Sequence, residues 1–416
     1  MKIVVCGYMV RYPVAGNILA YFQYVLGLHL LGHKVIYLEE SGWPYSCYDP
    51  VSQQWLDYPR AGLGIVRRLF DDYHLPVPLC YVDRSTGRVE GMSREALEEE
   101  IATADLLLNV GGVCWLPEFA SCPRLALVDM DPLFTQVGEF GAKLSGSYDV
   151  YDTCFSYGAN IGQPQCTIPA GGVRWLPAVP PVVPELWENR SECGVRSAEC
   201  GIVAPLIPHS ALRTPHSNAP FTTVAHWNAY GRITHDGEYY GQKSDEFLHL
   251  LHLPSLTAQP LELALSGADD AVLDELHAAG WSVRDAETEI NRSITTYRDY
   301  ILRSRGELSA AKHAYVRTRS GWFSDRSVCY LAAGLPVILQ ETGYSDWLPT
   351  GGGLLPFSTA EEALSCIERV NSDYEAHRRA ARALAYELFS YRVALPRLLE
   401  EAFASGYPAS GAEAPQ

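Results

Sequence analysis

Positive charge is scarce in this 416-residue sequence: 32 Lys and Arg stand against 49 Asp and Glu, a formal net charge of −17. Nucleic-acid-binding proteins gain most of their affinity by neutralising phosphates with Lys and Arg, so this balance argues against a nucleic-acid partner. It argues equally against adhesion to an anionic membrane surface. A phosphorylated ligand would therefore need a local basic patch.

The sequence also lacks the signatures of several large protein classes. No segment approaches the roughly 20 apolar residues of a membrane helix. Residues 1–10 form a short apolar run that Gly7 interrupts and no cleavage site follows, so we expect a first strand rather than a signal peptide. No Gly-x-Gly-x-x-Gly follows that strand and no P-loop sequence occurs, which argues against nicotinamide cofactors and P-loop nucleotides. We expect a soluble, cytoplasmic protein without a cofactor.

The eleven cysteines are odd in number, and no pair has Cys-x-x-Cys spacing. Several lie in apolar runs, such as Cys6 and Cys329, which is typical of reduced, buried thiols in a cytosolic protein. Cys114 and Cys122 come near a metal-binding spacing, but no histidine pair accompanies them. We therefore expect no metal site.

Apolar strands and amphipathic helices alternate in two series. Residues 1–10, 18–32 and 33–40 have the strand–helix–strand pattern of a βαβ unit, and a second series begins at Phe221 after a proline-rich connector. This pattern predicts an α/β fold of two Rossmann-like, doubly wound domains facing each other across a cleft. The expected divisions are an N-terminal domain over 1–182, a linker or insertion over 183–220, a C-terminal domain over 221–385, a C-terminal helix over 386–405 and a disordered tail over 406–416.

One loop of the second series has the pattern of an anion site. In open parallel sheets, ligands bind outside the carboxyl ends of the strands. A short strand expected over 314–318 leads through the loop SGWFSDRS (320–327) into an apolar helix. Such a helix start offers free backbone N–H groups and the positive end of the helix dipole. Ser324, Asp325 or Ser327 could cap this helix, with Arg326 in its first turn; an ordinary N-capped helix is the alternative.

The same region is locally basic. Between Arg292 and Arg326 the sequence has eight Lys or Arg, including Lys312, and three acids, a local balance of +5. A solvated helix face would explain such a run. Next to the loop at 320–327, it also favours an anion site.

The run FSDRSVCYLAAGLPVILQETG (323–343) resembles the donor-binding segment of GT-B glycosyltransferases, especially those related to families one and four. HWNAYG (226–231) and GQKSDEF (241–247) are similar to the glycine turn and basic segment that hold the donor phosphates. The resemblance implies that the C-terminal domain binds a nucleotide-diphosphate sugar and the N-terminal domain binds a small-molecule acceptor. It also implies that the C-terminal helix packs back on the N-terminal domain. WLPAVPPV resembles the interdomain linker of natural-product and lipid-modifying members.

The resemblance and the loop positions together suggest a set of donor- or phosphate-binding residues. These are Gly16, Asn17, Trp227, Asn228, Lys243, Lys312, Trp322, Phe323, Ser324, Asp325, Arg326, Ser327 and Thr342. No metal is implied, because the helix dipole, Lys243 and Arg326 could carry the charge of the leaving diphosphate.

Two residues are candidates for the catalytic base. Asp131 is the last residue of the run RLALVDMD (124–131), just beyond the expected strand, and His226 ends the strand that opens the second series, so both would stand at the mouth of the cleft. A turn aspartate and a structural histidine are the respective alternatives.

One expected pair of residues is missing. Retaining GT-B enzymes usually carry two glutamates eight positions apart, and Gly321 and Cys329 occupy those places here. The stereochemistry of transfer therefore stays open.

The predicted function is a metal-independent, hexosyltransferase-type glycosyltransferase acting on small molecules such as natural products. A GT-B-type sugar-nucleotide epimerase and a non-catalytic nucleotide-sugar-binding protein are the alternatives. The sequence does not indicate an oligomeric state.

Overall fold

The computed structural model describes residues 1–137, 148–188, 218–229 and 231–404. The first domain is built on an eight-stranded sheet with the order β10-β9-β8-β7-β1-β2-β5-β6, in which only the β5–β6 pair is antiparallel. Its strands are β1 (Lys2–Cys6), β2 (Lys34–Ser41), β5 (Leu79–Asp83), β6 (Arg88–Glu90), β7 (Leu106–Val110), β8 (Leu125–Asp129), β9 (Thr153–Ser156) and β10 (Trp175–Pro177). The central strands are apolar almost throughout because helices and loops cover both faces of the sheet.

The second domain is built on a six-stranded parallel sheet with the order β15-β14-β11-β16-β17-β18. Its strands are β11 (Phe221–His226), β14 (Leu261–Ser266), β15 (Ser282–Asp285), β16 (Gly306–Ser309), β17 (Val337–Gln340) and β18 (Leu354–Phe357). Each domain adds one antiparallel hairpin: β3 (Cys47–Asp49) with β4 (Gln54–Leu56), and β12 (Ile233–His235) with β13 (Glu238–Tyr240).

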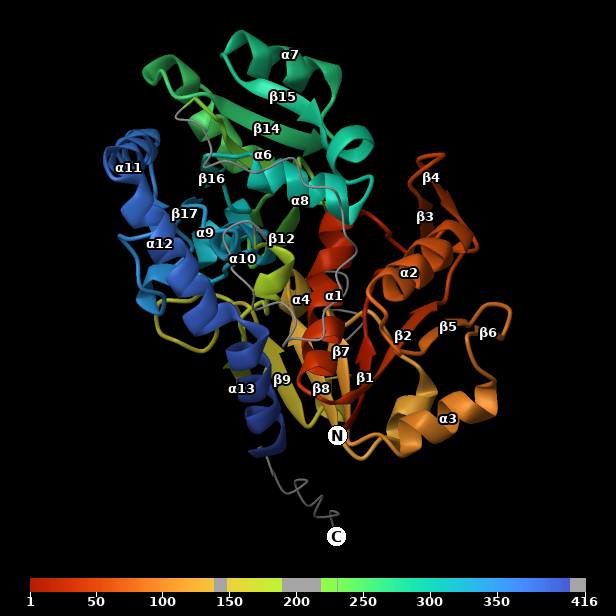
Figure 1. Cartoon of the computed structure of the whole chain (residues 1–416). Helices are drawn as coiled ribbons and strands as arrows, with labels where there is room; N and C mark the ends of the chain where they lie inside the picture. The colour runs from red at the N-terminus through yellow and green to blue at the C-terminus, as the bar shows by residue number, and fades with distance from the viewer. Residues whose placement is uncertain (138–147, 189–217, 230, 405–416) are drawn as a thin grey trace, which may run out of the picture.

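Helices cover these sheets and connect their strands. In the first domain they are α1 (Ala15–Leu30), α2 (Arg60–Asp72), α3 (Arg94–Ala102) and α4 (Phe134–Val137). In the second they are α6 (Lys243–Phe247), α7 (Asp270–Ala278), α8 (Ile294–Leu302), α9 (His313–Thr318), α10 (Asp325–Ala332), α11 (Ala360–Ser372) and α12 (Tyr374–Leu384), followed by α13 (Tyr391–Ala404). Figure 1 shows the two domains one above the other, with the final helix returning toward the first.

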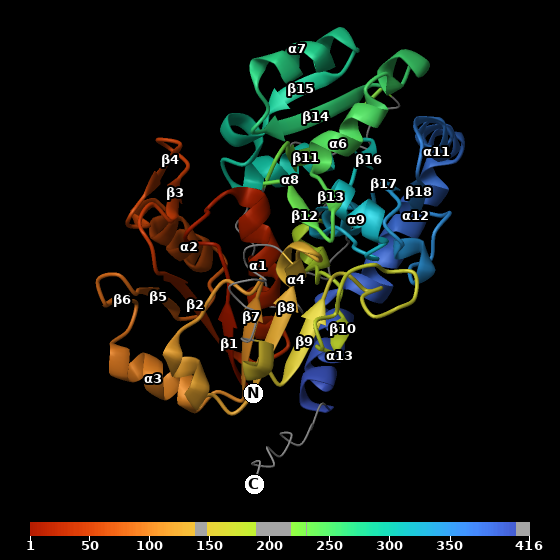
Figure 2. The same cartoon turned by 180° about the vertical axis from the view of Figure 1, so that it is seen from behind.

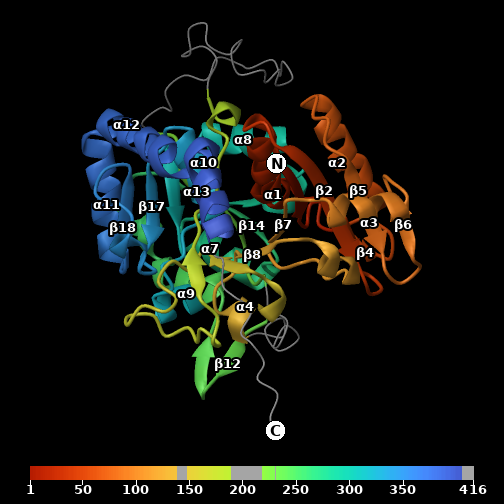
Figure 3. The ribbon, with the colours of Figure 1, turned by 90° about the horizontal axis from the view of Figure 1, so that it is seen from below.

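The return of α13 is fixed by close packing against α1, and Figure 3 shows the two helices from below. Gly27 of α1 allows this approach, because a Cβ there would stand 2.7 Å from Leu395 Cδ1. The backbone of Val182 exchanges hydrogen bonds of 2.8 Å with Phe389 and Tyr391, which joins the end of the first domain to the start of α13.

The strand orders place the ligand-binding edges. The order in which the chain adds strands to the sheet reverses between β1 and β7 in the first sheet, and between β11 and β16 in the second. Doubly wound sheets bind ligands in the crevice outside the carboxyl ends of such strands. The loops after β1, β7, β11 and β16 are therefore the first places to look for a site.

The predicted fold class, two doubly wound α/β domains facing each other, is confirmed. One element is corrected: the strand expected over 314–318 is the helix α9, and the preceding strand is β16. Residues 189–217 of the expected linker and the expected tail over 406–416 lie outside the described residues. Within the described part of the chain, no helix is long and apolar enough to cross a membrane.

Candidate functional site

The two domains meet at the carboxyl edges of their sheets. Asp131, two residues beyond β8, accepts hydrogen bonds at Oδ1 from the Lys312 ammonium and the Tyr315 hydroxyl of the second domain. Nearby, Trp322 Nε1 donates to the carbonyl of Met130 at 3.3 Å. Figure 2 shows α9 and the β12–β13 hairpin on the side of the second domain that faces the first. Asp131 therefore stands at the interface, as its expected role requires.

Lys243 is a buried cation at the start of α6. Its side chain makes no hydrogen bond or ion pair within the described part of the chain, although only 9% of the residue is exposed. Burial lowers the pKa of its amine well below the usual value; the charges of Arg326 and Lys312 lower it further, and those of Glu307 and Asp325 oppose this. A buried cation without a partner is costly. An anion bound beside this amine would offset that cost.

His226 ends β11 beside this cation. Burial lowers the pKa of its imidazole; Glu287 opposes that shift and the charges of Lys312 and Lys243 add to it. Its Nδ1 atom is buried without a hydrogen-bond partner among the described residues. Gly267 leaves room for the ring, because a Cβ there would clash with it. Burial therefore favours the neutral form of the His226 imidazole, close to the charges of Lys243 and Lys312.

Arg326 is occupied inside its own domain. Its Nε donates to Glu307 Oε1 at 2.5 Å, Nη1 to the carbonyl of Val224 at 3.0 Å and Nη2 to Ser309 Oγ at 2.8 Å. Burial lowers the pKa of the guanidinium, but the charge and hydrogen bond of Glu307, together with Tyr297 and Tyr330, outweigh burial and raise it. These bonds orient the guanidinium toward the sheet. They favour a structural role over the phosphate contact that the sequence suggested.

The start of α10 combines an ordinary cap with an acid. Ser324 Oγ accepts the backbone N–H of Ser327 at 3.4 Å, and the Ser327 hydroxyl is buried without a partner among the described residues. Burial raises the pKa of the Asp325 carboxyl, which the charges of Arg326 and Lys243 oppose. A carboxyl group at this point suits a hydroxyl donor better than a phosphate oxygen.

Several other candidates lie in the packed interior. Trp227 stacks on Phe247 at 5.9 Å, and Phe323 stacks on Phe389 at 5.1 Å. Thr342 donates its hydroxyl to the carbonyl of Trp322 at 2.7 Å. Each of these side chains is more than 90% buried. Their contacts are therefore with other residues of the protein interior.

Three polar or small candidates hold loops in place. Asn228 Oδ1 accepts from Ser244 Oγ at 2.6 Å, next to Lys243. Asn17 Nδ2 donates to the carbonyls of Tyr8 and Tyr12. Gly16 lies at the start of α1, where its N–H donates to Asn291 Oδ1 of the second domain at 3.3 Å. Asn291 thus caps a helix of the opposite domain.

The basic stretch over 292–326 does not form one patch. Arg298 donates to the carbonyl of Leu186, Arg305 to Asn371, Arg317 to Glu238 and Arg319 to Asp346, so these side chains diverge. Lys312 reaches Asp131 and Arg326 reaches Glu307. The local balance of +5 predicted one concentrated basic patch. In the structure the basic side chains point to separate partners, so the positive charge is spread over the domain.

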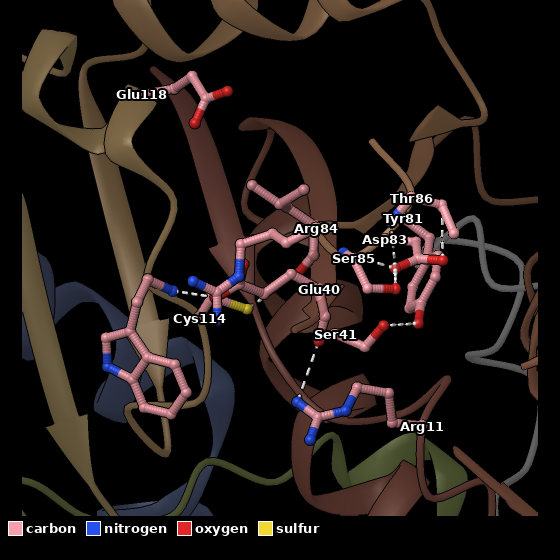
Figure 4. A network of polar contacts seen from close by, with 12 residues as sticks. Arg11, Glu40, Ser41, Tyr81, Asp83, Arg84, Ser85, Thr86, Cys114 and Glu118 are labelled. Atoms are coloured by element: carbon pink, nitrogen blue, oxygen red, sulfur yellow. Dashed lines mark hydrogen bonds and ion pairs between the residues drawn. The ribbon is translucent and has the colours of Figure 1, made fainter. Parts of the chain in front are cut away.

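The sequence reasoning did not single out Tyr315, Glu307 or two acids at the end of β2. Glu39 accepts from the backbone N–H of Val10 and Arg11, at 2.8 and 2.6 Å, and burial raises the pKa of its carboxyl to about 7. Glu40 accepts from Trp115 N–H and pairs with Arg84 at 2.8 Å (Figure 4). In the sequence, the only indication of this pair was that two adjacent acids follow the apolar residues of an expected strand.

No group of three His, Cys, Asp or Glu in the described part of the chain has the geometry of a metal site. The described cysteines are unpaired thiols, and all of them except Cys166 are buried.

No protein-family model and no curated protein matches the sequence. Solved structures do match over nearly the whole chain. The HepE protein of Anabaena in complex with UDP-glucose is 13% identical, with a TM-score of 0.55 over 97% of this chain and 100% of that one. AviGT4, a glycosyltransferase involved in avilamycin A biosynthesis, is 13% identical, with a TM-score of 0.54 over 98% and 99%. Sucrose-phosphate synthase of Thermosynechococcus elongatus is 14% identical, with a TM-score of 0.53 over 98% and 100%. At these identities the likeness establishes the fold, and this chain has the GT-B fold.

Proposed function

We propose that this protein is a glycosyltransferase that moves a sugar from a nucleotide-diphosphate sugar to a small-molecule acceptor. The observation that carries the proposal is the buried, unpartnered Lys243 at the ligand-binding edge of the second sheet. The neighbours support it: AviGT4 is named a glycosyltransferase, and HepE is described in complex with UDP-glucose. The acceptor class, including natural products, and the hexosyl group are part of the proposal.

The proposed step is a single exchange of bonds at the anomeric carbon of the donor. An acceptor hydroxyl oxygen bonds to this carbon as the bond to the β-phosphate oxygen breaks, and the electron pair of that bond leaves with the nucleoside diphosphate. Lys243 and Lys312 offset the charge that develops on the diphosphate, and this requires no metal. The hydroxyl proton passes to a base, for which Asp131 and His226 are the candidates.

The first prediction concerns nucleotide binding. Among UDP, TDP, GDP and ADP, at least one should bind the full-length protein in calorimetry and raise its unfolding temperature, because binding to the folded state alone stabilises it. Turnover of the matching nucleotide sugar should require an added acceptor. Consumption of the nucleotide sugar without an acceptor would indicate an epimerase or hydrolase. Binding without turnover would indicate a non-catalytic protein, and no binding to any of the four would contradict the proposal.

The second prediction separates the two candidate bases. Asp131→Asn should lower kcat by about 100-fold, the usual contribution of a general base, with little change in the donor KM. His226→Gln should cost less, and it keeps a polar side chain next to Lys243. Because burial lowers the pKa of His226, any loss of activity through protonation of its imidazole should begin at a lower pH than for an ordinary histidine. Steady-state kinetics of both variants from pH 5.5 to 8.5 provide the check. A larger loss of kcat in His226→Gln than in Asp131→Asn would reverse the assignment.

A further inference from the structure

Aromatic side chains gather at the ligand-binding edge of the first domain. We call Tyr8, Tyr12, Trp43, Tyr48 and Trp55 the aromatic cluster. The ring of Tyr12 stacks on Trp55 with centroids 5.7 Å apart and an interplanar angle of 6°, and Tyr48 packs within 5.4 Å of both rings. The Arg11 guanidinium lies between Tyr8 and Trp43, at 4.6 and 4.5 Å from the two ring centroids.

The chain topology puts this cluster beside the interface. Tyr8 and Tyr12 follow β1, Trp43 follows β2, and the remaining two lie on the β3–β4 hairpin. Tyr48 donates its hydroxyl to Glu287 of the second domain at 3.0 Å, so the cluster borders the facing domain. This is the edge of the sheet at which an open α/β fold binds its ligands.

Two members of the cluster are fixed on one side and open on the other. Trp43 is 41% exposed and Trp55 is 45% exposed, although each has one face covered by Arg11 or Tyr12. The adjacent Tyr45 is 68% exposed, and its N–H donates to Asp57 Oδ1 at 2.7 Å, which ties this loop to the hairpin. Large rigid aromatic faces lose little conformational entropy when they bind a ligand.

The positive charges of this edge are already matched. Arg11 is 3% exposed and donates to the carbonyls of Glu40 and Ser46, while Arg84 pairs with Glu40. Figure 4 shows the Glu40 segment between these two arginines. With Glu39 and Glu287 also close by, the described residues of this edge offer no surplus positive charge to a phosphorylated or carboxylated ligand.

We propose that the aromatic cluster binds the acceptor through an uncharged ring that stacks on the open faces of Trp43 and Trp55. This inference rests on the proposed function, which it deepens by naming the acceptor class. The ring can be aromatic or a pyranose, since both present a flat apolar face. The charges of the described residues at this edge disfavour an anionic acceptor.

Three probes test the acceptor class in the full-length protein: phenyl β-D-glucopyranoside, methyl β-D-glucopyranoside and glucose 6-phosphate. Kd is measured by calorimetry and tryptophan fluorescence with the nucleoside diphosphate that binds most tightly present. Glucose 6-phosphate should bind most weakly. Trp55→Ala and Trp43→Ala should each raise the Kd of the phenyl glucoside by about 5- to 10-fold, the scale of one aromatic contact. Trp55→Tyr should restore most of the affinity. Phe403 on α13 is about as exposed as the two tryptophans, and Phe403→Ala should leave the Kd unchanged.

The outcomes separate this inference from the proposed function. Tighter binding of the phenyl than the methyl glucoside supports an aromatic acceptor, and equal binding that still depends on Trp55 supports a pyranose. Tightest binding of glucose 6-phosphate, no binding of any probe, or binding that ignores both tryptophans would overturn the inference while nucleoside diphosphate binding persists. If the unaltered protein binds no nucleoside diphosphate, that result counts against the proposed function. The binding of the three probes is then measured without a nucleoside diphosphate.

Discussion

Lys243→Met is expected to lower kcat/KM for the nucleotide sugar by about 100- to 1,000-fold, the usual effect of removing one preorganised group that stabilises developing charge. Lys243 is buried and its side chain makes no hydrogen bond or ion pair within the described residues, so an arriving diphosphate would both pair with this amine and favour its protonated form. The same loss should appear as a higher Kd for the nucleoside diphosphate. Methionine keeps the length and flexibility of the lysine stem, so packing around α6 should change little.

The stability of this variant should move in the opposite direction. An unpaired buried charge destabilises the folded state, and its pKa is already lowered toward the neutral form. Removing it should leave the unfolding temperature equal to or above that of the unaltered protein. Lys34→Met is the matched control, because its ammonium pairs with Glu100 at 3.0 Å on the surface of the first domain. A clear drop in unfolding temperature together with unchanged affinity for the nucleoside diphosphate would assign Lys243 to the fold instead of the site.

The sequence predicted the elements that depend on local pattern. Apolar runs such as KIVVC and LELALS became β1 and β14, and Ser324 caps α10 as its position before the helix suggested. The segment over 314–318 was misassigned because its β-branched and aromatic residues favour a strand locally. In the structure it belongs to the helix α9, which is separated from the end of β16 by only three residues.

The candidate site depended on contacts that no local pattern contains. Asp131 meets Lys312 and Tyr315 across 181 and 184 positions of sequence, and Asn291 reaches Gly16 across 275. The expected basic patch near the loop at 320–327 is dispersed, because its side chains pair with separate partners. Which of the basic residues point into the interface follows only from how α8, α9 and α10 are arranged around the second sheet.

Arg326→Met is expected to destabilise the protein by about 3–5 kcal/mol, the usual cost of breaking a buried ion pair by removing one partner. Glu307 is fully buried, and one of its carboxylate oxygens already lacks a hydrogen-bond partner among the described residues. Without Arg326, its charge would remain in the sheet with no cation at hydrogen-bond distance. The Val224 carbonyl and the Ser309 hydroxyl would lose the two other N–H groups of the guanidinium.

A second substitution tests this explanation within the same protein. Arg326→Met combined with Glu307→Met removes both charges and fills the space with apolar side chains, so it should recover at least half of the lost free energy of unfolding in urea. The double variant should also bind the nucleoside diphosphate with nearly unaltered affinity, because the guanidinium is occupied by the sheet and Lys243 is the proposed partner of the diphosphate. If Arg326→Met were as stable as the unaltered protein but no longer bound the nucleoside diphosphate, the guanidinium would be a phosphate ligand, as the resemblance to the GT-B donor segment implies. The structure favours the first result, since the three hydrogen bonds of the Arg326 guanidinium within the described residues run to its own domain.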